Sequence, residues 1–180
     1  LDRVRGRKAY NIEKAIKLYQ KALKVRTRRA MPVEWAATMN NIAVAYFARL
    51  EGSRRENIEQ AIRHYGQALE VRTRQAMPVE WAQTMNNLAN AYRERIDDDR
   101  KENIEKAIGC YRKSLEVRTR KAMPVEWAKT MNNLATAYKY RVRNDHTENV
   151  HQAIKHYEEA LEVLQSEAFP ADHLKSQRNI

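Results

Sequence analysis

The chain has few of the residues that break helices or cross-link a fold. Its 180 residues include 4 Gly, 4 Pro and 1 Cys. The single thiol, Cys110, excludes an internal disulfide framework and is typical of a reducing compartment such as the cytoplasm. The chain also lacks a charged-then-apolar leader, and no apolar run approaches the ~20 residues that a membrane helix needs. We therefore expect a soluble, cytoplasmic protein.

Motifs for catalysis and for cofactor binding are missing as well. The glycines are isolated, so they cannot form a phosphate-binding loop, and there is no Gly-x-Ser-x-Gly turn. The histidines lack zinc-ligand spacing: His151 and His156, five residues apart, point to different sides of a helix. The acidic run 97–99 is better explained as a turn and helix cap than as a metal site. We expect no enzyme activity, no cofactor and no metal.

The sequence does contain one stretch that is repeated three times. Trp35, Trp81 and Trp127 each follow Met-Pro-Val-Glu and precede Ala-x-Thr-Met-Asn-Asn, at intervals of 46 residues. An Asn-(Ile/Val)-(Glu/His)-x-Ala-Ile run recurs at the same interval from Asn11 to Asn149. Such periodicity predicts a stacked array rather than a globular enzyme. We expect a single array in an excerpt from a longer protein, with full units at about 32–77, 78–123 and 124–169 and partial units at 1–31 and 170–180.

Each unit is predicted to contain two helices, because helix formers dominate its composition. The first helix begins at the repeated proline, whose missing amide costs nothing there, and the acidic residue two positions later favours the helix dipole. The second begins after a capping box such as Asp99 with Glu102 and runs to about Lys121. Residues 1–10 align with 47–56 and are expected to hold a helix end and a turn. The repeated aromatic residues of the first helices are candidates for the core: Trp35, Trp81, Trp127, Tyr46, Tyr92 and Tyr138.

These residues resemble the tetratricopeptide repeat. Leu88-Ala89-x-x-Tyr92 is similar to the Leu-Gly-x-x-Tyr of its first helix, and Ala61, Tyr65 and Ala68 have the spacing of its second helix. The family unit is about 34 residues, so this one is about 12 longer. The long form resembles the repeats of kinesin light chains and of bacterial multi-repeat proteins. The resemblance implies an all-α solenoid of antiparallel helix pairs, wound into a right-handed superhelix whose first helices line the concave side.

One stripe of the first helices varies between the copies. The variable positions, spaced so that they share one helix face, hold Ala37, Val44, Phe47 and Ala48 in the first copy. In the later copies they hold Gln83, Asn90, Arg93, Lys129, Thr136, Lys139 and Tyr140. Divergence of one stripe is expected where a groove meets a non-repeating ligand, although drift of an exposed face gives the same pattern. A partner with an acidic stretch and an apolar anchor would suit these residues.

Beside the stripe stands an unchanging pair of asparagines in every copy. Asparagine is a mediocre helix former, so its repetition in mid-helix needs a reason. The resemblance implies that the second member of each pair, Asn41, Asn87 and Asn133, hydrogen-bonds the backbone of an extended peptide; a carboxamide offers the required donor and acceptor. The alternative is that one member bonds the adjacent repeat structurally, which could hold for Asn40, Asn86 and Asn132.

The function we expect is a non-catalytic scaffold that binds a peptide or partner segment in this groove. The net charge of +11 leaves open polyanion or nucleic-acid binding through the Val-Arg-Thr-Arg motifs, although cations near helix ends are usually solvated and complement the dipole. Head-to-tail self-association of the array is a third possibility.

Overall fold

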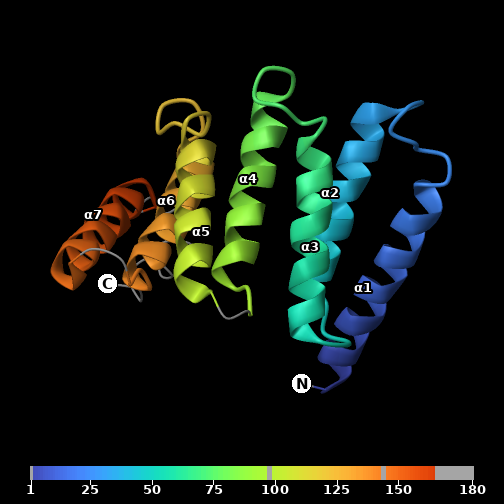
Figure 1. Ribbon diagram of the computed structural model, residues 1–180, viewed down its shortest axis with the longest axis horizontal. Helices are drawn as coiled ribbons and strands as arrows, with labels where there is room; N and C mark the ends of the chain where they lie inside the picture. Colours follow the sequence, from blue (N-terminus) through green and yellow to red (C-terminus); the bar gives the residue numbers. More distant parts are fainter. Residues whose placement is uncertain (1, 97–98, 143–144, 165–180) are drawn as a thin grey trace. The chain divides into compact units, whose positions relative to one another are not determined.

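The computed structural model describes residues 2–96, 99–142 and 145–164. These residues form seven helices and no strand: α1 (Asp2–Ala22), α2 (Pro32–Ala48), α3 (Arg54–Leu69), α4 (Pro78–Arg93), α5 (Arg100–Leu115), α6 (Pro124–Lys139) and α7 (His146–Leu164) (Figure 1). The chain divides into two compact units, Leu1–Asp98 with α1 to α4 and Asp99–Ile180 with α5 to α7. The all-α array of helix pairs is as predicted. The partial unit expected at 170–180 lies outside the described residues.

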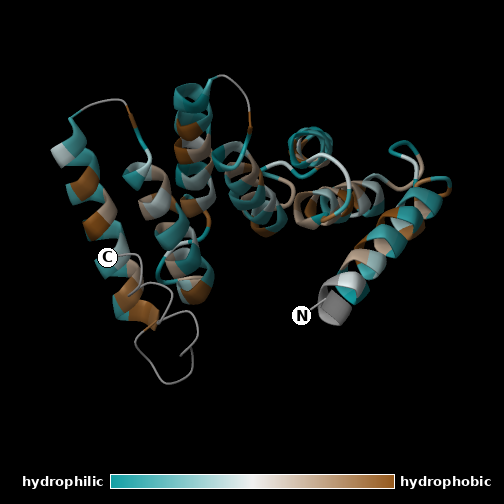
Figure 2. Ribbon diagram, turned by 90° about the horizontal axis from the view of Figure 1, so that it is seen from below, coloured by the Kyte–Doolittle hydropathy of each residue, from teal (hydrophilic) through white to brown (hydrophobic). Residues whose placement is uncertain are grey.

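Helix pairs are the building blocks of both units. In the first unit α2 packs against α3, α3 against α4, and α1 against α2; in the second, α5 packs against α6 and α6 against α7. We call α2, α4 and α6 the first helices and α1, α3, α5 and α7 the second helices. Figure 2 shows hydrophobic and hydrophilic residues on the same helices, as expected for elements that bury one side.

The helix starts follow the predicted chemistry. Each first helix begins at its proline with an acidic residue in the first turn. Ser53 caps α3 by accepting a hydrogen bond from the Glu56 amide at 3.4 Å, and Asp99 caps α5 through the Glu102 amide at 3.0 Å. Gly52, with φ of 75°, makes the turn before α3, a conformation that favours glycine.

Two predicted boundaries are wrong. The second helices are shorter than predicted, since α5 ends at Leu115 and not at about Lys121. The Val-Arg-Thr-Arg motif after it forms a turn in which Thr119 Oγ1 accepts a hydrogen bond from the Ala122 amide at 3.1 Å. Residues 2–10 are helical throughout, as part of α1. At the position of the capping Ser53 this copy has Arg7, which cannot cap a helix, so nothing in the sequence starts a new helix there.

The core lies between the helices of a pair. Small residues of the first helices, among them Ala36, Ala43, Ala82 and Ala89, have 0% exposure and let a second helix approach closely. The second helices α3, α5 and α7 each bury a tyrosine in return: Tyr65, Tyr111 and Tyr157 are exposed by 2% or less.

The aromatic residues predicted for the core are less deeply placed than expected. Trp81 and Tyr138 are buried, at 9% and 3% exposure. The other four are half-buried: Trp35, Trp127, Tyr46 and Tyr92. The tryptophans lie in the first turn of their helices, where arginines from the preceding loop cover the rings; Arg28 stands 5.7 Å from the Trp35 centroid and Arg120 5.6 Å from that of Trp127.

Candidate peptide-binding surface

The two members of each asparagine pair occupy different environments. The first member is buried, with exposures of 4% for Asn40, 9% for Asn86 and 5% for Asn132. The second member is nearer the surface: Asn41 is exposed, and Asn87 and Asn133 are half-buried. A helix turns by about 100° per residue, so adjacent positions cannot share one face. The pair therefore places one carboxamide in the packing layer and one at its edge.

The buried asparagine of the first copy joins two repeats. The Thr84 hydroxyl on α4 has one proton, which two acceptors share: Asn40 Oδ1 at 3.2 Å and the Glu80 carbonyl at 2.8 Å. Arg72, from the turn after α3, donates to the same hydroxyl at 3.0 Å. This network links α2, α4 and the end of α3, which matches the structural alternative considered for Asn40.

The outer asparagine is oriented by its buried neighbour. Asn40 Nδ2 lies 3.4 Å from Asn41 Oδ1, and Asn86 Nδ2 lies 3.4 Å from Asn87 Oδ1. These contacts engage the oxygen of the outer carboxamide and direct its NH2 group away from the buried partner. A group in that position can donate to a backbone carbonyl of a bound chain.

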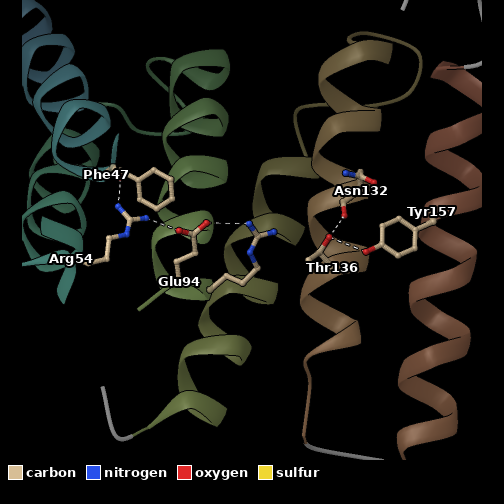
Figure 3. Close-up of polar contacts among 7 residues, drawn as sticks. Phe47, Arg54, Glu94, Asn132, Thr136 and Tyr157 are labelled. Atoms are coloured by element: carbon tan, nitrogen blue, oxygen red, sulfur yellow. Dashed lines mark hydrogen bonds and ion pairs between the residues drawn. The ribbon is translucent and has the colours of Figure 1, made fainter. Parts of the chain in front are cut away.

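Most residues of the variable stripe lie at or near the surface. Gln83, Lys129 and Lys139 are exposed, Tyr140 is 50% exposed, and Asn90 is half-buried. Thr136 is half-buried like Asn90, but its hydroxyl is engaged by other residues. Its hydroxyl lies 2.9 Å from the Asn132 carbonyl and 2.9 Å from the buried hydroxyl of Tyr157 on α7, so its polar group serves the helix pair (Figure 3). We leave Thr136 out of the candidate surface.

The stripe of the first unit is less basic than its sequence implies. Glu94 follows α4 and forms an ion pair with Arg54, whose Nη2 lies 2.6 Å from one carboxylate oxygen. Arg93 Nη2 lies 3.5 Å from the other oxygen of Glu94. The Arg54 guanidinium also covers the Phe47 ring at 4.9 Å and donates to the Phe47 carbonyl (Figure 3). The sequence reading overlooked Glu94, whose carboxylate offsets part of the positive charge of Arg93.

Two of the motif arginines, Arg72 and Arg118, contradict the expectation of a solvated face, whereas Arg26, Arg28, Arg74 and Arg120 are exposed. Arg72 and Arg118 are buried, at 6% and 7% exposure, and each donates to a threonine of the next first helix. Burial lowers the pKa of both guanidinium groups. Arg28 and Arg120 form ion pairs with Glu70 at 2.5 Å and Glu162 at 2.9 Å. The two buried arginines are therefore not accessible to a polyanion, whereas Arg28 and Arg120, whose side chains are 57% and 55% exposed, remain at the surface in ion pairs.

Sequence reasoning missed a recurring ion pair between a second helix and the end of the following first helix. In each copy an arginine contacts both carboxylate oxygens of a glutamate 36 positions earlier: Glu13 with Arg49, Glu59 with Arg95, and Glu105 with Arg141. The hydrogen bond from Arg49 lowers the pKa of Glu13. Opposite charges at constant repeat positions were the available signal.

The described residues contain no cluster of three or more metal-ligating side chains. Cys110 is half-buried, and partial burial raises the pKa of its thiol to about 11. Within residues 2–96, 99–142 and 145–164, no helix is sufficiently long and apolar to span a membrane.

Comparisons with known families agree with this architecture. Residues 81–120 match the family described as Tetratricopeptide repeat. Residues 5–24, 36–70 and 128–162, together half of the chain, match the family described as Sel1 repeat. A search of curated proteins finds no significant match. Repeats of these two kinds are generally non-catalytic modules for protein–protein interaction.

Proposed function

Because this chain belongs to the tetratricopeptide-like repeat proteins, with matches to the Sel1 repeat along half of its length, we propose that within each compact unit the outer asparagines of the first helices bind an extended peptide. The observation that carries the proposal is the division of each asparagine pair. The buried member stabilises the stack, whereas Asn41, Asn87 and Asn133 stand nearer the surface beside positions that differ between copies.

The chemistry of the outer row suits a backbone ligand. One carboxamide per repeat can hydrogen-bond a peptide whatever its side chains are, and each such bond contributes about 0.5–1.5 kcal/mol net. Selectivity then depends on the variable neighbours. Gln83, Lys129 and Lys139 favour polar or acidic side chains, and Val44, which is 43% exposed, offers an apolar contact. We propose a partner segment with an acidic stretch and one apolar or aromatic anchor.

The test is binding of a labelled peptide library, in which acidic content and the position of one aromatic residue vary, to the chain and to a triple variant. With Asn41, Asn87 and Asn133 replaced by alanine, a peptide on the first unit loses two such bonds and a peptide on the second unit loses one, so affinity should fall by about 2- to 150-fold. A matched control is Gln75→Ala, which removes an exposed carboxamide from the loop before α4. An unchanged affinity in the triple variant, with the fold intact by circular dichroism, contradicts the proposal.

A further inference from the structure

The positive charge of the chain is concentrated on α1 and the turn that follows it. Residues 6–31 contain 9 lysines and arginines and 1 acidic residue, which gives a net charge of +8. The equivalent ranges of the other copies, 52–77, 98–123 and 144–169, have net charges of +2, +3 and −5. Because the whole chain carries +11, most of the excess belongs to one of four related segments. Solubility of the array as a whole does not require so uneven a distribution.

The cations of this segment include a single straight row on α1. Its members follow one another at intervals of three or four residues, which places them on one face of the helix. We call them the basic stripe: Arg7, Tyr10, Lys14, Lys17, Lys21 and Lys24. Lys24 continues the last turn, since its amide donates to the Lys21 carbonyl at 3.1 Å. All six residues are exposed, Tyr10 by 64%, and the helical rise gives the stripe a length of about 25 Å.

The basic stripe has little compensation from acidic groups. Glu13 stands beside it, but Arg49 contacts both oxygens of this carboxylate at 2.6 and 3.0 Å and lowers its pKa more than Lys17 does. Within residues 2–96, 99–142 and 145–164, no member of the stripe forms an ion pair. Lys17 is three residues from Lys14 and four from Lys21, and like charges at these spacings destabilise a helix. The stripe therefore does not serve the stability of α1.

The side of the helix that carries the stripe stays open to solvent in a complete helix pair. At the equivalent positions of α3, Glu56, Arg63 and Glu70 are exposed although α2 packs against that helix. The residue at the position of Lys24 is glutamate in every other copy, and on α3 this Glu70 pairs with Arg28 of the turn one copy earlier at 2.5 Å. A lysine cannot make that pair. The stripe thus differs from the other copies at an exposed position that they use for a contact between repeats.

The chemistry of the stripe favours a nucleic acid over a protein or a membrane. Protein–protein interfaces have apolar centres and are depleted in lysine, whereas nucleic-acid interfaces are strongly basic. A flat anionic membrane would also meet Glu70, because Arg28 holds that carboxylate near the turn after α1. A strand is narrow enough to follow α1 alone. Its phosphates can pair with a row of lysines, and an exposed ring such as that of Tyr10 can stack on a base.

We propose that the basic stripe binds the phosphate backbone of a single nucleic-acid strand without selecting its sequence. Arg7 and the four lysines contact phosphates, and Tyr10 stacks on one base. A strand carries one charge per roughly 3.4 Å, so about seven phosphates lie along the stripe. The outer asparagines that are proposed to bind peptides belong to the first helices, so the two sites are independent of each other.

The test is fluorescence anisotropy of a labelled oligothymidylate of about 20 nucleotides, titrated with the full chain at about 50 mM salt. Binding should be saturable and should weaken as salt is added, because the contacts release counterions. The triple variant Lys14→Gln, Lys17→Gln, Lys21→Gln should raise the Kd by about tenfold or more. It should also reduce the slope of log K against log salt by about 2, since each phosphate contact contributes about 0.7. Glutamine is a good helix former, so the fold should be retained.

A charge-matched control separates the stripe from the net charge. The variant Lys113→Gln, Lys121→Gln, Lys155→Gln removes three exposed lysines from the second unit, and its Kd should stay within about twofold of that of the unaltered chain. Tyr10→Ala should weaken binding by about fivefold or more if the ring stacks on a base.

Three outcomes would overturn the proposal. The first is the absence of saturable binding at low salt, and the second is an equal loss in the charge-matched control. The third is tighter binding of the stripe to phosphatidylserine vesicles or to a polyglutamate peptide than to the oligonucleotide, which would assign it to a membrane or a protein. The variant in which Asn41, Asn87 and Asn133 are alanine should bind the oligonucleotide normally, so failure of one proposal does not imply failure of the other.

Discussion

Arg141 and Glu105 form a two-point ion pair, with Nε 2.7 Å from Oε1 and Nη2 2.8 Å from Oε2. The glutamate lies on α5 and the arginine follows α6, so the pair joins a second helix to the end of the next first helix. Its side chains are 16% and 20% exposed, compared with 29% and 28% for Arg49 and Glu13. Less water means less screening, so the Arg141 pair should be the stronger of the two.

A double-mutant cycle measures this difference. With Arg141→Lys and Glu105→Gln, we expect a coupling free energy of about 1 kcal/mol, at the upper end for partly exposed pairs, because lysine cannot make the two-point contact. The equivalent cycle at Arg49 and Glu13 should give a smaller coupling. Urea denaturation followed by circular dichroism supplies the values. Equal coupling in the two cycles would contradict the link to burial.

A second prediction concerns the contribution of the hydrogen bond between Arg72 and Thr84 to the free energy of unfolding. Thr84→Val removes the acceptor from a buried guanidinium and should lower the free energy of unfolding by about 1–3 kcal/mol. Arg72→Met in the same chain replaces the stranded charge by an apolar side chain, so the double variant should be more stable than Thr84→Val alone. The measurement is thermal unfolding of the unaltered chain, the two single variants and the double variant. A double variant less stable than either single variant would show that Arg72 stabilises the fold in another way.

The sequence predicted the helix pairs because their signals are local and repeat in register. A proline with an acidic residue after it, or Ser53 at the end of a turn, marks a helix start through bonds to neighbouring backbone. It did not predict that Arg72 and Arg118 would be buried, because their partners are threonines 12 residues further along in another helix. A charged residue is usually placed at the surface unless its acceptor is known.

The candidate surface could be predicted in part because the repeats can be compared in register. Comparison of the copies separated constant from variable positions, and most variable ones lie at or near the surface, as do Gln83 and Lys129. Thr136 could not be recognised as an exception, because its contact with Tyr157 depends on how α6 and α7 pack. The ion pair between Glu94 and Arg54 could not be predicted either, because the two residues are 40 positions apart and meet only when α3 and α4 pack.

Two half-buried histidines should make stability depend on pH. His64 stacks on Tyr46 with ring centroids 5.6 Å apart, and His156 lies against Tyr138 at 5.5 Å. Burial lowers the pKa of both imidazoles below the ordinary 6.5. As the pH falls, these imidazoles take up protons at a higher pH in the unfolded chain than in the folded chain. Their contribution to the free energy of unfolding is therefore fully present above about pH 6.5 and is lost as the pH falls through the folded pKa.

The measurement is the Tm at pH 7.5 and pH 5.5. The unaltered chain should lose stability between the two values, and the double variant His64→Phe, His156→Phe, which keeps the rings without titrating, should lose less. His151→Phe is the control, because His151 is exposed. An identical pH dependence in the double variant would exclude these two imidazoles as its source.

The thiol of Cys110 should react slowly. It occupies the register of His64 and His156, and burial raises its pKa from 9.0 to about 11. The thiolate is the reactive form, so modification by iodoacetamide at pH 8 should be roughly a hundredfold slower than for a thiol with the unshifted pKa. Mass spectrometry over time gives the rate, and the urea-unfolded chain is the reference. A rate equal to that of the unfolded chain would contradict the burial of Cys110.

The asparagine pair of α2 offers the most direct separation of stability from binding. Asn40→Ala removes the acceptor that faces Thr84, so unfolding should become easier by about 1 kcal/mol. Asn41→Ala replaces an exposed asparagine by the best helix former and should leave stability unchanged or raise it by up to about 0.7 kcal/mol. If the outer row binds peptides, the same Asn41→Ala chain should bind them less well despite its stability. Asparagine weakens its own helix, and the proposed peptide contact accounts for its presence at this position. If Asn41→Ala lowers the free energy of unfolding and leaves the peptide affinity unchanged, both asparagines stabilise the fold and neither binds peptide.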